Sequence, residues 1–202
     1  MVMTKQVLHK FTFAILALTV FAAPAYAGWR DQISSNDVER LAHLDDARDY
    51  AIGQAQSRSG QGDFRAVKEI LEPQPHAVPL QALYGNWRCR QVKLGGMTGY
   101  AVFSWFNCNI RQVNGGLWFQ KDGTQRMAGY LYPDNGVWVY LGAQSAKGEP
   151  WHRYSGQAAS MGAAASQDDQ VGILVGIGPN RLRIDMPSPA VESDFDAIEL
   201  VR

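Results

Sequence analysis

From Leu83 onward, apolar and polar residues alternate with a period of two, which is the pattern of half-buried β-strands. In the stretch 181–187, for example, Leu182, Ile184 and Met186 fall on one face and the charged residues between them on the other. Short turns rich in glycine, asparagine and aspartate separate the alternating segments, a combination typical of antiparallel hairpins. The alternation predicts eight strands, over residues 83–94, 100–112, 116–121, 125–132, 136–143, 170–177, 181–187 and 194–201.

Eight strands without crossover helices favour a closed barrel or a sandwich, and closure is preferred because it leaves no free sheet edge. Residues 144–169 interrupt the strands with a segment that is rich in alanine, serine and glycine and shows neither period. Two interpretations of this irregular segment stay open: a mobile flap over the barrel mouth, or a disordered insertion. The sequence thus predicts one antiparallel β-barrel domain over residues 81–202.

Before the strands the apolar residues recur every three to four positions, which indicates helices. Residues 36–56 are expected to form an amphipathic helix that begins with a capping box of Asn36 and Glu39. A shorter helix capped by Asp63 should follow, and three prolines between positions 73 and 79 then give an extended linker. We expect residues 28–80 to form a helical hairpin and linker docked on the barrel, so the fold class is mainly β (α+β).

The first 27 residues have the three parts of an export signal. Lys5 and Lys10 lie in a segment without acidic residues, an apolar run follows, and the segment ends in the cleavage pattern Ala25-Tyr26-Ala27. The apolar run ends at Pro24 and is shorter than the ~20 residues that span a bilayer. We therefore expect cleavage after Ala27, a periplasmic location and no stable membrane insertion of the mature chain.

The net charge argues against a nucleic-acid partner. The whole chain has 19 basic and 19 acidic residues, and loss of Lys5 and Lys10 with the signal leaves 17 against 19, a net charge of −2. A slightly acidic chain lacks the basic excess that binding to nucleic acid requires.

Cys89 and Cys108 are the two cysteines of the chain and fall on consecutive predicted strands. If the hairpin turns at Thr98 and Gly99, residue 89 lies directly opposite residue 108, with both side chains on one face. Export favours oxidation, and the sequence has neither the C-x-x-C spacing of a redox pair nor nearby histidines to complete a metal site. We expect a structural disulfide that stabilises the fold by about 3 kcal/mol.

Motifs that carry catalysis or bind phosphate do not occur in this sequence. There is no G-x-S-x-G, no P-loop, no H-E-x-x-H and no glycine-rich loop that opens a helix. The histidines at positions 43, 76 and 152 show no metal-ligand spacing. We therefore expect no catalytic residue, no metal and no cofactor.

Arginines and aromatic residues are the features that remain as candidates for ligand binding. Aligned guanidinium groups on one strand face could hold a carboxylate or phosphate, or could simply form a solvated outer face. Aromatic side chains that point into a barrel could line a ligand cavity or fill the interior. The arginines are at positions 88, 90, 111, 126, 181 and 183. The ligand-binding candidates are Trp87 and Phe106 as walls, with Arg88 and Arg90 beside them.

The tripeptide Gly85-Asn86-Trp87, at the start of the first long strand, resembles the G-x-W signature of lipocalins and related calycin barrels. The resemblance implies a calycin-like antiparallel barrel of roughly eight strands. By analogy it also implies binding of a small apolar ligand, or inhibition of another protein.

Several blocks that keep their order along the chain resemble a family of exported bacterial proteins, domain of unknown function 4893. The resemblance implies an exported β protein with two cysteines and assigns no activity to any residue. The blocks are residues 37–41, 87–95, 106–110, 140–142, 178–183 and 196–200.

Taken together, these features favour a non-catalytic barrel that binds a small apolar or amphiphilic ligand. The alternative is a module that binds or inhibits an envelope protein through its arginine faces. A hydrolase is the third hypothesis, and it would need a nucleophile and a base in a polar cleft. The expected partner is therefore an unknown small molecule or an envelope protein.

Overall fold

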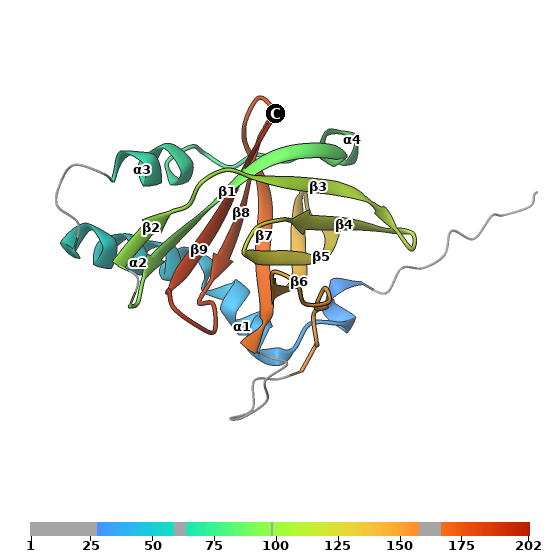
Figure 1. The fold of residues 1–202 in the computed structure, drawn as a ribbon, viewed down its shortest axis with the longest axis horizontal. Helices are drawn as coiled ribbons and strands as arrows, with labels where there is room; N and C mark the ends of the chain where they lie inside the picture. Colours follow the sequence, from blue (N-terminus) through green and yellow to red (C-terminus); the bar gives the residue numbers. More distant parts are fainter. Residues whose placement is uncertain (1–27, 59–63, 98, 158–166) are drawn as a thin grey trace, which may run out of the picture.

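A computed structural model describes residues 28–58, 64–97, 99–157 and 167–202, with helices first and strands after them (Figure 1). The predicted export signal, Asp63, Thr98 and residues 158–166 of the irregular segment lie outside the described residues. The helices are η1 (Trp29–Asp31), α1 (Ser35–Ala42), α2 (Leu44–Arg58), α3 (Arg65–Leu71) and α4 (Leu80–Leu83). The strands are β1 (Gly85–Gly95), β2 (Gly99–Val102), β3 (Phe106–Val113), β4 (Gly116–Lys121), β5 (Gln125–Asp134), β6 (Val137–Ala146), β7 (Asp169–Gly178), β8 (Arg181–Pro187) and β9 (Phe195–Val201).

The strands form one antiparallel sheet that closes on itself. From β3 to β9 each strand pairs with the next along the chain, and β9 returns to pair with β1. On its other edge β1 pairs with β2 near its end and with β3 near its start, so β2 and β3 together fill one position in the ring. The result is a closed barrel with eight strand positions, which confirms the predicted mainly β fold with helices before the barrel.

One predicted strand, 100–112, is interrupted. Residues 103–105 separate β2 from β3, and the pairing with β1 shifts by one residue between Val92↔Val102 and Cys89↔Phe106. The predicted turn at Thr98 and Gly99 is also wrong, because Gly99 already pairs with Gly95. An extra residue in one strand of an antiparallel pair produces such a shift, as in a β-bulge.

The disulfide is present although the predicted register is wrong. Cys108 lies directly opposite Trp87, and Cys89 lies opposite Phe106, so the two cysteines are diagonal neighbours on one face. Their Cα atoms are 5.9 Å apart, within the usual range for a disulfide. The bond joins β1 to β3 beside the interruption.

Side chains fill much of the barrel interior. The inward-facing residues of all eight positions form one buried cluster, and two indole N–H groups in it donate to main-chain carbonyls: Trp87 to Leu83 and Trp138 to Val78, each at 2.9 Å. The apolar members of the cluster include Ile110, Phe119, Met127, Tyr140, Leu174, Ile184, Met186, Ile198 and Leu200.

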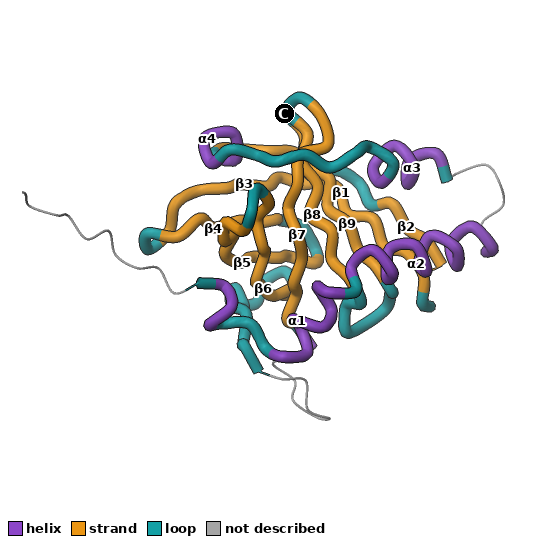
Figure 2. Tube along the Cα trace, turned by 180° about the vertical axis from the view of Figure 1, so that it is seen from behind, coloured by secondary structure: helices purple, strands orange, loops and turns teal. Residues whose placement is uncertain are grey.

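The helices cover one outer side of the barrel (Figure 2). Helix α2 packs on β1, β2, β8 and β9, and its buried Ala51 and Ala55 join a second apolar cluster with α3. The predicted single helix 36–56 is divided at His43, and Ser34 rather than Asn36 caps α1, because its Oγ accepts the Asp37 N–H at 3.2 Å. Among the described residues, no helix has both the length and the apolar character needed to cross a bilayer.

The proline-rich segment between α3 and α4 crosses one end of the barrel. His76 and Gly176 exchange two main-chain hydrogen bonds of 2.9 Å, and the carbonyl of Val78 accepts from Trp138. Pro79 then precedes α4, as suits the start of a helix. The segment therefore places α4 at the barrel mouth, next to the start of β1 and above β3 (Figure 1).

Candidate functional site

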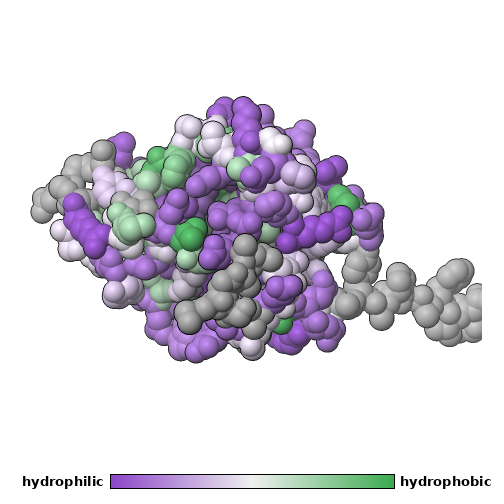
Figure 3. All heavy atoms as spheres, turned by 60° about the horizontal axis from the view of Figure 1, so that its bottom comes forward, coloured by the Kyte–Doolittle hydropathy of each residue, from purple (hydrophilic) through white to green (hydrophobic). Residues whose placement is uncertain are grey.

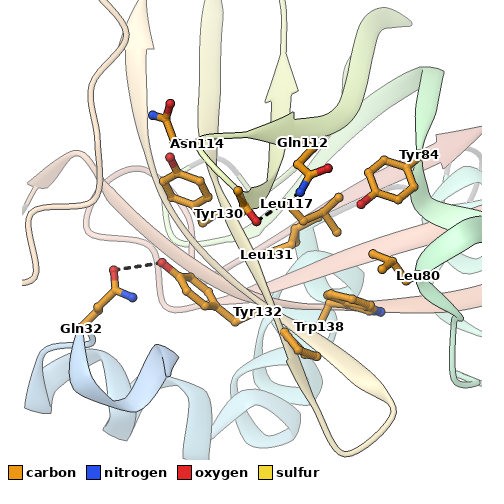
Figure 4. Close-up of a pocket in the computed structure, with 13 residues that line it drawn as sticks. Gln32, Leu80, Tyr84, Gln112, Asn114, Leu117, Tyr130, Leu131, Tyr132 and Trp138 are labelled. Carbon is orange, nitrogen blue, oxygen red and sulfur yellow. Dashed lines mark hydrogen bonds between the residues drawn. The ribbon is translucent and has the colours of Figure 1, made fainter. Parts of the chain in front are cut away.

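The barrel mouth beside α4 contains a pocket of about 430 Å³, which we call the mouth pocket (Figure 4). Four parts of the chain build it: residue 32 after η1, helix α4, the β3–β4 turn, and the β5–β6 hairpin. The lining residues are Gln32, Leu80, Tyr84, Gln112, Asn114, Gly115, Gly116, Leu117, Tyr130, Leu131, Tyr132, Pro133 and Trp138.

The inner wall of the mouth pocket is apolar. Leu117 and Leu131 pair across β4 and β5, and both side chains are buried in the barrel core with Trp138. The hydrogen bond from the Trp138 indole to Val78 fixes the orientation of that ring. Leu80 of α4 adds an apolar side chain that remains 38% exposed, so this wall continues to the surface.

Two tyrosines of β5 form an aromatic wall. Tyr130 packs edge-on against Trp118, with 4.8 Å between ring centroids, and lies 6.3 Å from Tyr132. The Tyr132 hydroxyl donates to Gln32 Oε1 at 2.9 Å. Burial raises the pKa of Tyr132, against a smaller opposing effect of this hydrogen bond, so the phenol stays neutral at physiological pH.

The N-terminal segment is held against the rim of the mouth pocket. The Arg30 guanidinium donates to both carboxylate oxygens of Asp134, at 3.2 and 3.3 Å. Asp134 directly follows the lining residue Pro133. With the Gln32–Tyr132 hydrogen bond, this pair ties the segment around η1 to the end of β5. One side of the mouth pocket is thus formed by the N-terminal segment and not by the barrel.

Neutral polar groups complete the lining. Asn114 has a positive φ of 49°, which suits asparagine in the β3–β4 turn, and Gln112 Nε2 donates to the Gly115 carbonyl at 3.5 Å. The Tyr84 hydroxyl points toward the centre of the mouth pocket (Figure 4). The lining contains no aspartate, glutamate, lysine, arginine or histidine.

The predicted wall residues Trp87 and Phe106 lie outside this lining. Trp87 is buried in the barrel core, where the Arg202 guanidinium stacks on its ring at 3.8 Å from the centroid. Phe106 is half-buried, and the Lys121 ammonium lies 4.8 Å from the centroid of its ring.

The predicted arginines Arg88 and Arg90 lie together on the outer face of β1, also outside the mouth pocket. Their guanidinium groups approach the ring of Trp105 at 5.9 and 4.8 Å from the centroid. Arg90 Nε donates to Glu199 at 2.7 Å, and Arg181 binds the other oxygen of the same carboxylate. The structure therefore brings the two arginines to each other and to Trp105, and away from Trp87 and Phe106.

A second hollow, of about 440 Å³, lies between α2, α3 and the proline-rich segment. In contrast to the mouth pocket it is lined by charged residues, among them Asp45, Arg48 and Lys68. Arg183 at its base is fully buried and donates to Asp185 and to the carbonyls of Ile70 and Leu71. These contacts tie α3 to β8, so we regard this arginine as structural.

The surface seen in Figure 3 is mostly hydrophilic, with small separate apolar patches. Within the described ranges, no three His, Cys, Asp or Glu side chains are grouped so as to hold a metal ion. His152 and Asp168 form a pair, with 2.9 Å between Nδ1 and Oδ2, outside the mouth pocket.

Sequence reasoning did not identify the residues of the mouth pocket. They come from segments as far apart as residues 32 and 138, and none belongs to a motif. Two features of the sequence could have indicated these residues. One is the aromatic pair Tyr130 and Tyr132 on one strand face, and the other is the apolar Leu80 and Tyr84 between Pro79 and Gly85.

Comparison with known proteins finds a match to one family model, described as domain of unknown function (DUF4893), over residues 29–200. The resemblance noted in the sequence is thereby confirmed, and the eight-stranded antiparallel barrel is consistent with the calycin-like resemblance. No curated protein and no solved structure matches the chain.

Proposed function

We propose that this chain, which belongs to the DUF4893 family, is a non-catalytic binding protein that takes a small apolar or amphiphilic molecule in the mouth pocket. The observation that carries the proposal is the apolar wall of Leu117, Leu131 and Trp138 at the open end of an otherwise packed barrel. Small-molecule sites are commonly concave, mostly apolar and about 300–1,000 Å³ in volume, and the mouth pocket fits this description.

The amphiphilic part of the proposal rests on the tyrosines. A tyrosine side chain offers an apolar ring and one hydroxyl, so it can contact the body of a ligand and bind its polar group. Tyr84, Tyr130 and Tyr132 place three such groups around the apolar wall. A ligand with an apolar body and a polar end would match both surfaces.

The test is fluorescence binding of N-phenyl-1-naphthylamine, an apolar probe that brightens in apolar surroundings. Leu80→Gln should weaken probe binding about tenfold, because it places an amide in the apolar wall. Leu80 is 38% exposed, so the substitution should leave the fold intact. Val191→Gln is the matched control, because Val191 is 40% exposed and lies away from the pocket. Equal affinity of wild type and Leu80→Gln would overturn the proposal.

Native mass spectrometry identifies the natural ligand. Protein isolated from its own host is expected to carry a bound small molecule that the Leu80→Gln protein lacks. An identical bound mass in both proteins would place the ligand elsewhere and count against the mouth pocket.

We infer in addition that the protein is exported to the periplasm. The observation behind this inference is the three-part signal in residues 1–27, and the Cys89–Cys108 disulfide supports it because such bonds persist in oxidising compartments. N-terminal sequencing of the cell-derived protein should begin at Gly28. Retention of Met1 in the mature protein would contradict export by signal cleavage.

A second candidate function is binding of an acidic segment of an envelope protein. It is favoured by Trp105, which is 36% exposed and flanked by the guanidinium groups of Arg88 and Arg90. Tryptophan and arginine are the residues most enriched at energetically important interface positions. Trp105→Ala should abolish saturable capture of a periplasmic partner, and unchanged capture would remove this candidate.

A further inference from the structure

The mouth pocket also indicates the charge of its ligand. We infer that it selects uncharged amphiphiles, an apolar body with one neutral hydrogen-bonding group, over carboxylates, sulfonates and other ions of the same shape. This inference rests on the proposed function of the same pocket. The lining that carries it consists of aliphatic, aromatic and amide side chains and glycine.

An ion entering this pocket would lose water without gaining a counter-ion. Burial of a charge costs several kcal/mol unless the charge is paired, so about 1.4 kcal/mol of uncompensated cost already lowers affinity tenfold. Three charged residues adjoin the lining in sequence. Asp134 pairs with Arg30 at the rim, Asp31 accepts the Gly28 N–H at 3.0 Å, and Arg111 donates to Gln120 Oε1 at 3.1 Å. Each of these charged groups lies outside the lining and already has a polar partner, which an incoming ion would have to displace.

The tyrosines do not supply a charge either. Burial raises the pKa of Tyr132, so its phenol does not become an anion near neutral pH. The hydrogen-bonding groups of the lining are thus all neutral: phenol hydroxyls, amides and main-chain groups. Such groups pair well with an alcohol, an amide or a carbonyl.

Tyr84 is the residue that would meet the neutral group of the ligand. Its hydroxyl points to the centre of the pocket (Figure 4), and it makes no hydrogen bond within the described part of the chain. The Tyr132 hydroxyl, by contrast, is already bonded to Gln32. A ligand hydroxyl or carbonyl beside Leu80 and Leu131 would therefore lie within reach of Tyr84.

The test uses two probes with the same ring skeleton. N-phenyl-1-naphthylamine is neutral, and 8-anilinonaphthalene-1-sulfonate differs by one sulfonate. The neutral probe should bind wild type at least about tenfold more tightly, and both affinities should depend on Leu80. Equal affinities of the two probes at a site sensitive to Leu80→Gln would overturn the charge inference and leave the proposed function standing. A neutral probe insensitive to Leu80→Gln would instead remove the proposed function.

A gain-of-function variant tests the same inference from the opposite side. Gln112→Lys adds a cation at an exposed lining residue and should raise the affinity of the sulfonate probe, relative to the neutral one, by about fivefold or more. Gln74→Lys adds the same charge in the second hollow and should leave the ratio unchanged. An unchanged ratio in Gln112→Lys would show that charge at this pocket does not govern selection.

The role of Tyr84 is tested with 1-naphthol and 1-methylnaphthalene as competitors of nearly equal shape. Tyr84→Phe should weaken 1-naphthol about three- to tenfold, the effect of one hydrogen bond, and leave 1-methylnaphthalene unchanged. Tyr50→Phe, on the exposed face of α2, should change neither. Equal losses for both competitors would show that Tyr84 only packs, which contradicts its assignment.

Discussion

Some single residues in the barrel interior are charged, and their burial destabilises the folded state although most of the core is apolar. Lys121 is 1% exposed, and its ammonium donates to the Gln125 carbonyl at 2.6 Å. No carboxylate among the described residues lies at hydrogen-bonding distance from it. Lys93, also buried, is paired with Glu192 at 2.6 Å. Burial, with a further contribution from Lys93, lowers the pKa of Lys121 to about 8. The two lysines therefore make one end of the interior polar, opposite in character to the mouth pocket.

The lowered pKa of Lys121 predicts how stability depends on pH. Between pH 8 and pH 10.5 the unfolded chain holds a proton that the folded chain has lost, so the free energy of unfolding should rise with pH over this range. Below pH 8 both states are protonated and the folded state bears the whole cost, about 3 kcal/mol. Urea unfolding at pH 7.0 to 9.0 measures most of this rise and stays below the pKa of about 10 at which unfolded tyrosines ionise.

Lys121→Met provides the control for that measurement. The variant should be more stable than wild type at pH 7 and should lose most of the rise, because the buried cation is gone. Lys147→Met, at an exposed lysine, should keep the rise of the unfolding free energy with pH. A Lys121→Met protein that is less stable than wild type at pH 7 would show that the buried ammonium is favourable after all.

Tyr140 gives a second prediction at the residue scale. Its hydroxyl is fully buried and has no hydrogen-bond partner among the described residues, and it lies where a side chain on Gly142 would project. Tyr140→Phe should therefore raise the free energy of unfolding by about 1–2 kcal/mol. Gly142→Ala should destabilise both wild type and Tyr140→Phe, because the added methyl would also meet the Ala128 carbonyl oxygen and the Tyr140 ring. Thermal unfolding of wild type and the variants measures both effects, and a Tyr140→Phe protein less stable than wild type would contradict the predicted cost of the unpaired hydroxyl.

At the scale of elements, β1 organises the barrel because its two edges pair with three strands. The alternation in the sequence located all eight strand positions, since side-chain period follows directly from a half-buried strand. It missed the break at 103–105 because Phe103-Ser104-Trp105 continues the chain without glycine or proline. The register of the cysteines was wrong for the same reason. It also missed the division of the first helix at His43, because the apolar stripe continues through that position.

The disulfide should stabilise the pairing of β1 with β3. The Cys89→Ala, Cys108→Ala double variant is expected to lose about 3 kcal/mol of unfolding free energy, the value for a loop of this size. Urea unfolding with and without reductant measures the loss. Under reducing conditions the unfolding free energy of wild type should approach that of the double variant. If reductant does not change it and wild type has two titratable thiols, the disulfide is contradicted.

At the scale of the whole molecule, the barrel, its helices and the proline-rich segment together position one open, uncharged pocket. Helices α1 to α3 cover one side, and the proline-rich segment places α4 at the mouth. No local pattern predicts such a site, because its wall exists only after residues 32, 80 and 131 have been brought together by the fold. The fold class could thus be predicted from periodicity. The predicted pocket walls were wrong, because Trp87 lies in the core and Phe106 lies beside Lys121.

An amide NMR titration of residues 28–202 with N-phenyl-1-naphthylamine tests the central claim most directly. We predict that the shift changes concentrate at residues 80–84, 114–117, 130–133 and 138, around the mouth pocket. They should disappear in Leu80→Gln at the same probe concentration. Changes concentrated on α2 and α3, around the charged hollow, would contradict the assignment of the mouth pocket as the binding site.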